Sequence, residues 1–442
     1  MLFTTDKQTL DDLHIFGRYG GDAVYNIFNR TVTHGGALIL EEMFRHPLSD
    51  HISINRRSNI IQHFAAAGTV YPFAAPLFDA IEPYIGNTDE RTKLSADEQS
   101  VSKKLAGMIV SDGNTQMVYK GVQSLVTLLQ SVRVFIDSKA GGIAYEQERN
   151  ILASLLAAPA FAPVLAQQGK LSHATIAAYD VILRFRHREL IQQLLHYLYY
   201  LDVYLSVAKV AAERGFVFPQ AISDSGCRAI VEGVYHPLLP KAIANTIHIT
   251  EQNNVIFLTG ANMAGKSTFM KSLGIALFLA HMGFPVAAAK MEFSVLDGIY
   301  TTINLPDNLG MGASHFYAEV LRVKKIAQEL SQGKRLFIVF DELFRGTNVK
   351  DAYEATIAIT SRFARKHNSI FVISTHIIEA GDVLRQQCSN VHFVYLPTRM
   401  DGHKPVYTYT LEHGITNDRH GMIIISNEGI LDMLEAGLTK TK

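Results

Sequence analysis

The fold is decided by the run Thr259-Gly260-Ala261-Asn262-Met263-Ala264-Gly265-Lys266-Ser267-Thr268. The eight residues from Gly260 to Ser267 match the pattern G-x-x-x-x-G-K-[ST] at every fixed position. An apolar stretch, 254–259, precedes the loop and a helical pattern follows it, which is the context that a phosphate-binding loop requires. Glycines let backbone N–H groups curl around phosphate oxygens, and the helix N-terminus adds partial positive charge. The sequence therefore predicts a loop that binds the triphosphate of ATP.

Each position of this loop has an expected role in holding the nucleotide or its metal. The residues expected to bind ATP are Gly260, Ala261, Asn262, Met263, Ala264, Gly265, Lys266, Ser267 and Thr268. Lys266 is expected to reach the β- and γ-phosphates, and the Ser267 hydroxyl is expected to coordinate Mg²⁺. A chance match to the pattern is the alternative, and the flanking strand and helix argue against it.

A second apolar run, 336–340, ends in the adjacent carboxylates Asp341 and Glu342. Because neighbouring side chains on a strand point to opposite sides, the two carboxylates can take different roles. Asp341 is expected to support Mg²⁺, and Glu342 is expected to polarise the attacking water. A solvated acidic pair at a strand end is the alternative interpretation.

A third apolar run, 369–374, leads into Thr375 and His376. A polar residue at this place in a phosphate-loop ATPase can sense the γ-phosphate, so His376 is expected to join Glu342 as a catalytic residue. Taken alone, a histidine at a strand end is more often structural. Its place after the two earlier motifs favours the functional interpretation.

The two parts of the 442-residue chain have different patterns. From about residue 9 to 214, long helical patterns dominate, such as the three- and four-residue spacing of apolar residues over 116–138 and a further pattern over 174–214. Beyond about residue 227, short apolar strands alternate with helices; besides the three already described, strands are expected over 391–395 and 406–411. This alternation indicates strands buried on both faces of a mostly parallel sheet. We expect an all-α domain over 1–220 and an α/β P-loop NTPase domain over 221–442.

Composition limits the classes of protein that fit. Hydrophobic residues make up 48% of the chain and charged residues 19%, which is typical of a globular fold. Basic and acidic residues number 41 each, and this balance neither supports nor excludes nucleic-acid binding through a local patch. The two cysteines, Cys227 and Cys388, are too few for a disulfide framework and too far apart for a metal site. Prolines interrupt the two most apolar stretches, 151–167 and 274–289, so we expect no membrane segment and a cytoplasmic protein.

Five segments resemble those of the MutS family of DNA mismatch repair ATPases. They are 259–268 (TGPNMGGKST in the family), 341–347 (DELGRGT), 374–376 (S/A-T-H), 312–319 (GxSTFxxE) and 235–237 (R-H-P). The adjacent Asn262 and Met263 are unusual among phosphate loops at large. In the family, the segment similar to 312–319 meets the nucleotide across a dimer. The resemblance therefore implies a homodimer through the ATPase domains, in which Ser314 contacts the ATP held by the other subunit.

The resemblance extends upstream, where 12–15, 27–33 and 45–48 are similar to the start of the family's core and lever domain. It implies a helical core/lever domain over 1–220, with the clamp reduced or absent, and an ABC-type ATPase domain over 221–442. The chain is expected to start at the core domain, without the mismatch-recognition and connector domains of full mismatch sensors. Ala261, Ala264 and Phe344 replace a proline and two glycines of the family pattern, and the position of the adenine-stacking aromatic aligns with Ala242.

We therefore expect a MutS-like, Mg²⁺-dependent ATPase that acts as a dimeric switch on DNA, in mismatch repair or a related DNA transaction. A second hypothesis is an ATP-dependent module that binds a DNA structure or a partner without recognising mismatches. Transporter and chromosome-maintenance ATPases share the phosphate loop, but the LSGGQ-like signature expected of them is replaced here by 312–319. Candidate DNA phosphate contacts are Arg184, Arg186, His187 and Arg188 on a long helix, with a solvated helix face as the alternative.

Overall fold

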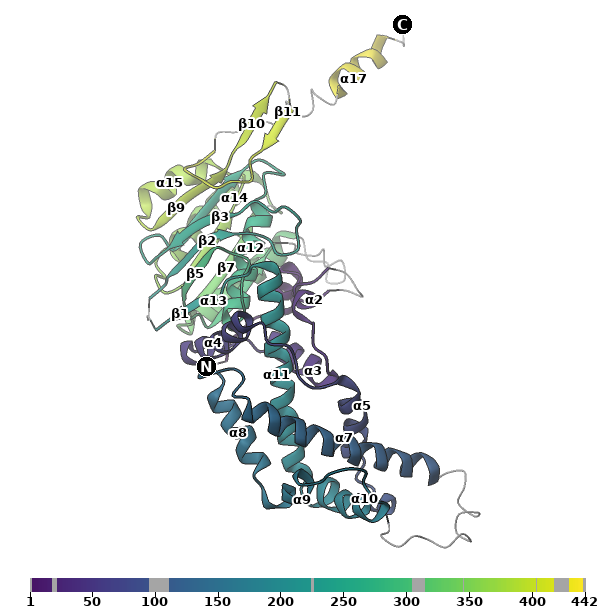
Figure 1. The fold of residues 1–442 in the computed structure, drawn as a ribbon. Helices are drawn as coiled ribbons and strands as arrows, with labels where there is room; N and C mark the ends of the chain where they lie inside the picture. The colour runs from purple at the N-terminus through teal and green to yellow at the C-terminus, as the bar shows by residue number, and fades with distance from the viewer. Residues whose placement is uncertain are drawn as a thin grey trace. The chain divides into compact units, whose positions relative to one another are not determined.

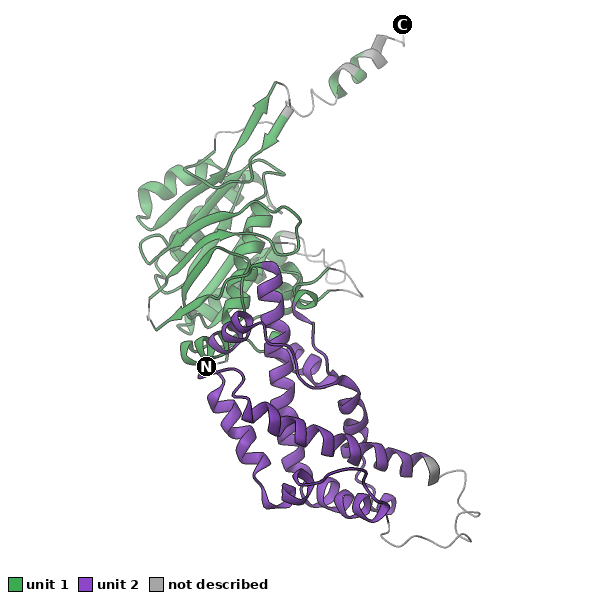
Figure 2. Cartoon of the chain, viewed as in Figure 1, with its two compact units in different colours: residues 1–27, 44–58, 215–442 green, residues 28–43, 59–214 purple. Residues whose placement is uncertain are grey.

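A computed structural model describes residues 2–17, 22–94, 111–223, 226–303, 315–344, 346–402, 404–416 and 429–439. The chain divides into two compact units (Figure 2). Unit 1 consists of Met1–Ile27, Phe44–Ser58 and Gly215–Lys442, and unit 2 consists of Phe28–Met43 and Asn59–Arg214. The expected division at residue 220 is therefore incomplete. Unit 2 does end close to it, at Arg214, but two stretches near the amino terminus belong to unit 1.

Unit 2 is helical in the parts that the structure describes (Figure 1). Its elements are α5 (Ala75–Gly86), η1 (Glu90–Thr92), α7 (Ser111–Asp137), α8 (Glu146–Leu156), η2 (Pro159–Phe161), α9 (Ala162–Leu165), α10 (His173–Asp180), η3 (Val181–Arg186) and α11 (Arg188–Arg214), together with parts of α3 (His34–Arg45) and α4 (His51–Ala67). The helix expected over 116–138 is α7, which starts a few residues earlier.

A buried carboxylate joins the two sequence stretches of unit 2. Asp202 on α11 is 1% exposed and accepts hydrogen bonds from the backbone N–H groups of Val32 and Thr33 and from the Thr33 hydroxyl. One turn further along α11, the Ser206 hydroxyl donates to the Phe28 carbonyl at 2.8 Å. Because a buried polar group is costly unless it is hydrogen-bonded, these contacts fix the shorter stretch on α11.

The helical pattern over 174–214 corresponds to two helices, α10 and α11, with the π-helical turn η3 between them. Within this turn, Arg184 forms an ion pair with Asp180 at 2.7 Å, and both side chains are fully buried. Arg184 also donates to the hydroxyl and the carbonyl of Thr92. A guanidinium buried in this way cannot reach a DNA phosphate, so the expectation for Arg184 is wrong and its role is structural. Arg186, two residues on, is exposed.

The described residues of unit 1 form two sheets and a hairpin. The strands are β1 (Gln220–Ile222), β2 (Ala229–Val234), β3 (Asn245–Ile249), β4 (Val255–Gly260), β5 (Lys290–Ser294), β6 (Gly298–Thr302), β7 (Leu336–Asp341), β8 (Ile370–Ser374), β9 (Val391–Leu396), β10 (Thr398–Asp401), β11 (Lys404–Tyr407) and β12 (Glu412–His413). The helices are α1 (Lys7–Asp12), α2 (Val24–Phe28), α12 (Lys266–His281), α13 (His315–Ser331), α14 (Val349–Phe363), α15 (Glu379–Gln387) and α17 (Ile430–Thr439), together with the remaining parts of α3 and α4.

The larger sheet has the strand order β12-β9-β4-β8-β7-β6, and every neighbouring pair is parallel except β12 with β9. The smaller sheet has the order β1-β5-β2-β3, and only β1 with β5 is parallel. Strands β10 and β11 form the antiparallel hairpin. The mostly parallel α/β sheet that the sequence predicts is therefore confirmed.

The strands at the core of unit 1 are buried on both faces, which explains why their sequences are unbroken apolar runs. Every residue of β4 and β8 is buried, as is β7 up to Phe340. Helix α12 contacts β2 of the smaller sheet and β4 and β7 of the larger one, and most of its residues from Phe269 to His281 are buried. A helix that is apolar on all sides belongs in the interior. The apolar stretch 274–289 is thus largely the buried end of α12, and no helix among the described residues is long and apolar enough to cross a membrane.

The strand expected over 406–411 is wrong. Strand β11 ends at Tyr407, and β12 begins only at Glu412. Between them, Tyr409 has a φ of 55°, a left-handed conformation that an extended strand does not tolerate. The chain turns here, and this turn brings the Tyr409 side chain to the phosphate loop.

Candidate nucleotide-binding site

The candidate site lies at the carboxyl ends of three neighbouring strands. β4 ends at Gly260, β8 at Ser374 and β7 at Asp341, and β8 lies between the other two. The strand registers pair Leu258 with Ser374, and Ser374 with Asp341. The loops that follow these strands therefore meet at one edge of the sheet, which is where open α/β sheets bind ligands.

The loop between β4 and α12 has the backbone of an anion-binding turn. Gly260, Met263 and Gly265 have φ values of 149°, 68° and 101°. Alternation of left- and right-handed residues turns successive N–H groups toward a common point, and the first N–H groups of α12 have no partner within the helix. At Gly265 a Cβ would lie 2.9 Å from the ring of Tyr409, so both its conformation and the space around it require glycine. Ala264 is buried, whereas Asn262 and Met263 are exposed.

Lys266 folds back over this loop. Its Nζ donates to the carbonyls of Gly260 at 2.9 Å and Ala261 at 3.1 Å, and it lies 3.5 Å from Nε2 of His376. The side chain is almost fully buried, and this burial lowers the pKa of the ammonium, while the carboxylates of Asp341 and Glu342 act in the opposite direction. The Lys266 ammonium is therefore held at the phosphate loop by carbonyl oxygens, which phosphate oxygens can replace.

Ser267 and Asp341 form a pair of oxygen ligands. The Ser267 hydroxyl donates to Oδ2 of Asp341 at 2.6 Å. The other carboxylate oxygen, Oδ1, is buried and has no hydrogen-bond partner among the described residues. Mg²⁺ prefers hard oxygen donors, and it commonly takes one or two from the protein and the rest from phosphates and water. The residues present therefore fit a magnesium ion. Among the residues that the structure describes, no cluster of three or more His, Cys, Asp or Glu side chains offers another metal site.

Glu342 and His376 form the second polar pair of the site. Oε1 of Glu342 lies 2.9 Å from Nε2 of His376, and both side chains are partly open to solvent. Glu342 has a φ of 53°, and its backbone N–H donates to the Ser374 carbonyl at 2.9 Å. Non-glycine residues rarely adopt this conformation, and those that do often lie at functional positions. A carboxylate and an imidazole held together beside a phosphate loop can orient water and accept its proton.

Tyr409 is a neighbour of the loop that sequence reasoning missed. Its ring packs against Gly265, and the side chain is 45% exposed. The amide of Asn245 fixes this turn, because its Nδ2 donates to the Tyr409 carbonyl at 2.9 Å and its Oδ1 accepts from the Leu411 N–H at 2.7 Å. The alignment with the family pattern pointed to Ala242 for the base contact, and no local motif around residue 409 indicates that it returns to the loop.

The structure thus brings together Lys266, Ser267, Asp341, Glu342 and His376 from three separate loops. Thr268, also expected at the site, is exposed at the start of α12. Ser314 lies outside the described residues. The roles of all these residues in nucleotide binding and catalysis remain predictions from sequence and geometry.

Comparison with known proteins agrees with this arrangement. The family model described as MutS domain V matches residues 256–434, a range that starts within β4 and includes every described residue of the candidate site. The DNA mismatch repair protein MutS of Persephonella marina (strain DSM 14350 / EX-H1) is 31% identical over 238 residues, which are 53% of this chain and 27% of that protein. The chain therefore matches only about a quarter of the length of this relative. Residues 256–434 of this chain therefore match domain V of the MutS family.

Proposed function

We propose that this chain binds ATP with Mg²⁺ and hydrolyses it. The observation that carries the proposal is the convergence of a lysine, a serine–aspartate pair and a glutamate–histidine pair, linked by contacts of 2.6 to 3.5 Å. Phosphoryl transfer depends on a cation for the phosphates, ligands for the metal and a group that positions the attacking water. This site offers one candidate for each.

The proposed roles follow from the contacts of each side chain. Lys266 exchanges its carbonyl partners for oxygens of the β- and γ-phosphates, and the N–H groups of the loop surround the phosphates. Ser267 and Asp341 hold Mg²⁺, which, when bound, neutralises charge that develops on the phosphate oxygens. Glu342 orients the water and accepts its proton. His376 keeps the Glu342 carboxylate in place and senses the γ-phosphate.

Tyr409 provides the base contact in this proposal. Its partly exposed ring lies beside the first turn of α12, and aromatic faces stack favourably on planar rings. The phosphate loop and the Tyr409 ring together offer an anion site and an aromatic surface side by side. This pairing suits a nucleoside triphosphate better than inorganic triphosphate.

We also propose that two copies pair through their ATPase domains and act as an ATP-dependent switch on DNA, with the helices of unit 2 as a core/lever domain. Two observations support this: the 312–319 segment, including Ser314, resembles the part of the family that meets a second subunit's nucleotide, and the relative from Persephonella marina is named as a DNA mismatch repair protein. ATP bound between two subunits would then stabilise the dimer.

Sedimentation velocity with and without Mg-ATP tests the dimer. The dimer fraction is expected to rise with ATP in the unmodified protein and to stay constant in Lys266→Ala. An unchanged distribution would contradict the dimeric switch, while hydrolysis is tested separately by phosphate release.

Titration against matched, mismatched and branched duplexes at a fixed salt concentration tests the DNA partner. A preference for mismatched duplex supports mismatch repair. Equal binding to all duplexes, or a preference for branched DNA, supports the alternative function, an ATP-dependent module that binds DNA structure without recognising mismatches. Absence of DNA binding at every salt concentration would contradict mismatch repair and leave the other form of the alternative, a module that binds a protein partner.

A further inference from the structure

Residues 4–12, which we call the amino-terminal strap, pack on the outer edge of the larger sheet of unit 1. Thr4 forms a parallel bridge with Gly298 on the edge strand β6: its N–H donates to the Asp297 carbonyl at 2.8 Å, and its carbonyl accepts from the Ile299 N–H at 3.0 Å. A Cβ at Gly298 would lie 2.4 Å from the Thr4 carbonyl oxygen, so this close approach requires glycine. The strap therefore pairs with an edge that would otherwise present free backbone groups.

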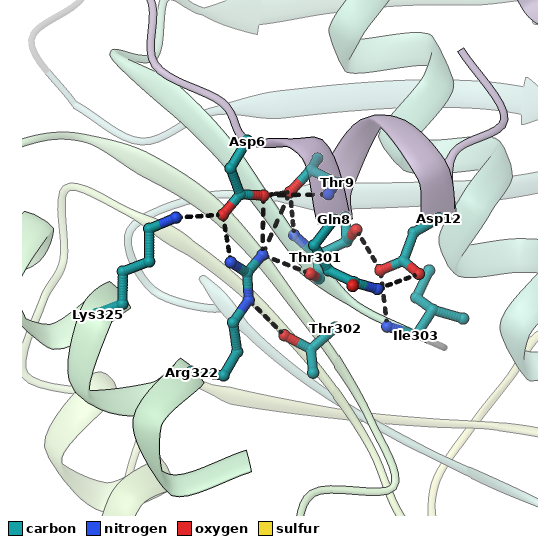
Figure 3. A network of polar contacts seen from close by, with 9 residues as sticks. All are labelled: Asp6, Gln8, Thr9, Asp12, Thr301, Thr302, Ile303, Arg322 and Lys325. Atoms are coloured by element: carbon teal, nitrogen blue, oxygen red, sulfur yellow. Dashed lines mark hydrogen bonds and ion pairs between the residues drawn. The ribbon is translucent and has the colours of Figure 1, made fainter. Parts of the chain in front are cut away.

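Helix α1 of the strap also binds the carboxyl end of β6 (Figure 3). Oδ2 of Asp12 accepts from the Thr301 hydroxyl at 2.8 Å and from the Ile303 N–H at 2.9 Å, and the Thr9 hydroxyl accepts from the Thr301 N–H at 3.0 Å. Thr9 and Asp12 are both buried. Thr302 of β6 pairs with Phe340 of β7, the residue before Asp341. The contacts of α1 therefore fix β6 next to the expected metal ligand.

The strap binds α13 through a charged cluster (Figure 3). The carboxylate of Asp6 accepts hydrogen bonds from both terminal nitrogens of Arg322 and from Nζ of Lys325, the latter at 2.6 Å. Burial alone would raise the pKa of Asp6, but its hydrogen bonds and the charge of Arg322 hold the pKa well below its usual range. Asp6 also caps α1 by accepting from the Thr9 N–H at 3.1 Å. One carboxylate thus joins α1 to α13.

Helix α13 in turn supports the loop that carries Glu342. Phe316, in its first turn, packs edge-on against Phe344 with 5.9 Å between the ring centroids. Further along the helix, Val323 and Ile326 belong to the same apolar cluster as Phe344. Phe344 has a φ of 64°, which is rare for a bulky residue and persists only where the surroundings hold it. Packing on α13 is therefore part of what keeps this loop, and with it Glu342, in its conformation.

We propose that the amino-terminal strap and α13 form a positioning device for Glu342. The ion pair of Asp6 with Arg322 fixes α13. Phe316 on α13 packs against Phe344 and so holds the loop that carries Glu342, two residues earlier. Asp6, Arg322 and Phe316 are thus positioning residues, since they act through Glu342. The inference rests on the proposed function only in the statement that Glu342 acts on ATP.

Asp6→Asn tests the charge of Asp6 separately from its capping role, because asparagine caps a helix as well as aspartate does but lacks the charge that binds Arg322 and Lys325. We expect kcat for ATP hydrolysis to fall about fivefold or more while KM changes less than about twofold, the pattern for a residue that affects the reacting geometry and not nucleotide binding. The matched control is Glu329→Gln on the same helix, which removes the ion pair with Lys334 just beyond the end of α13 and is expected to leave both parameters unchanged. Equal behaviour of the two variants would overturn the proposal.

Phe316→Leu tests whether the effect passes through α13. If Asp6 and Phe316 act along one route, the double variant loses little more kcat than the more impaired single variant. Losses that multiply in the double variant would show independent effects and would contradict the proposed route.

Hydrogen exchange of the nucleotide-free protein separates this inference from the proposed function. Asp6→Asn is expected to speed amide exchange in α13 and over 341–344, relative to Glu329→Gln, and to leave β4 and α12 unchanged. Thermal melting confirms that each variant is folded at the assay temperature. Unchanged exchange over 341–344 would overturn the positioning device whatever the turnover. Faster exchange there, in a protein that fails to hydrolyse ATP, would support the device and refute the proposed function.

Discussion

Lys266→Ala is the substitution whose effect on nucleotide binding follows most directly from the site. The ammonium is nearly buried and has two carbonyl partners, on Gly260 and Ala261, at the mouth of the loop. When a triphosphate binds, we expect it to exchange these neutral partners for phosphate oxygens. Alanine removes the cation and leaves the loop backbone intact.

The size of the loss follows from the two hydrogen bonds to phosphate oxygens that the ammonium is expected to make in the complex. A hydrogen bond to a charged group contributes about 1.5–3 kcal/mol, so two of them contribute about 3–6 kcal/mol. Because about 1.4 kcal/mol corresponds to a factor of ten, the Kd for Mg-ATP is expected to rise at least ~100-fold. Burial already disfavours the charged lysine, as the lowered pKa of Lys266 indicates, so its removal is expected to cost little folding stability.

Fluorescence anisotropy with a labelled ATP analogue measures this Kd directly. Lys290→Ala is the matched control, because Lys290 is an exposed lysine of the same unit on β5 and its nearest acidic partner, Glu232, is 3.8 Å away. The control is expected to bind like the unmodified protein, and thermal melting checks that both variants are folded. Retention of the Kd within about threefold in Lys266→Ala would refute the assignment of the phosphate loop.

Three further predictions concern the water-activating group, the base contact and a buried histidine. Glu342→Gln is expected to bind ATP normally and to hydrolyse it ~100-fold or more slowly, as for the loss of a general base, so that an ATP-bound dimer accumulates; unchanged phosphate release would place the base elsewhere. Tyr409→Ala is expected to weaken binding of ATP about tenfold, in line with the ~1–3 kcal/mol of one stacked base, and to leave binding of inorganic triphosphate unchanged; equal losses for both ligands would argue against stacking. His281 is fully buried, its Nδ1 donates to the Leu277 carbonyl and its Nε2 accepts from the Leu296 N–H, and burial lowers its pKa to about 4. Between pH 4 and the ordinary pKa of 6.5, the folded protein therefore binds fewer protons at His281 than the unfolded protein does. The contribution of His281 to the free energy of unfolding is thus fully present above pH 6.5 and falls by about 3 kcal/mol as the pH is lowered to 4. Urea unfolding of the unmodified protein and of His281→Asn across this pH range measures the difference, and parallel pH profiles would contradict it.

The sequence predicts well the features that a short segment determines. The phosphate loop, the strand that ends at Asp341 and the strand before His376 are each recognisable from an apolar run that ends in polar residues. The structure places all three at one edge of the sheet. The parallel order of these strands follows from their burial on both faces. Loop residues such as Lys266 and Ser267 are near each other because they are consecutive in the chain.

Features that depend on distant contacts were missed. The contact of Asp6 with Arg322 joins the first residues of the chain to the rest of unit 1, and no local pattern near either residue signals it. The sequence places Arg184 among basic residues on a long helix, but the π-helical turn and Asp180 place it in the interior. The sequence predicts a strand at Tyr409, whereas its left-handed conformation is set by Asn245 and by the loop it packs against.

In the proposed function, Lys266, Ser267, Asp341 and Glu342 form a Mg²⁺-dependent ATP-hydrolysing site. Phosphate release from ATP by the purified chain, measured with Mg²⁺, with a chelator in its place and in Glu342→Gln, tests it most directly. We expect steady release with Mg²⁺ and almost none under the other two conditions. Absence of release with Mg²⁺, or release that persists in the chelator or in Glu342→Gln, would contradict it.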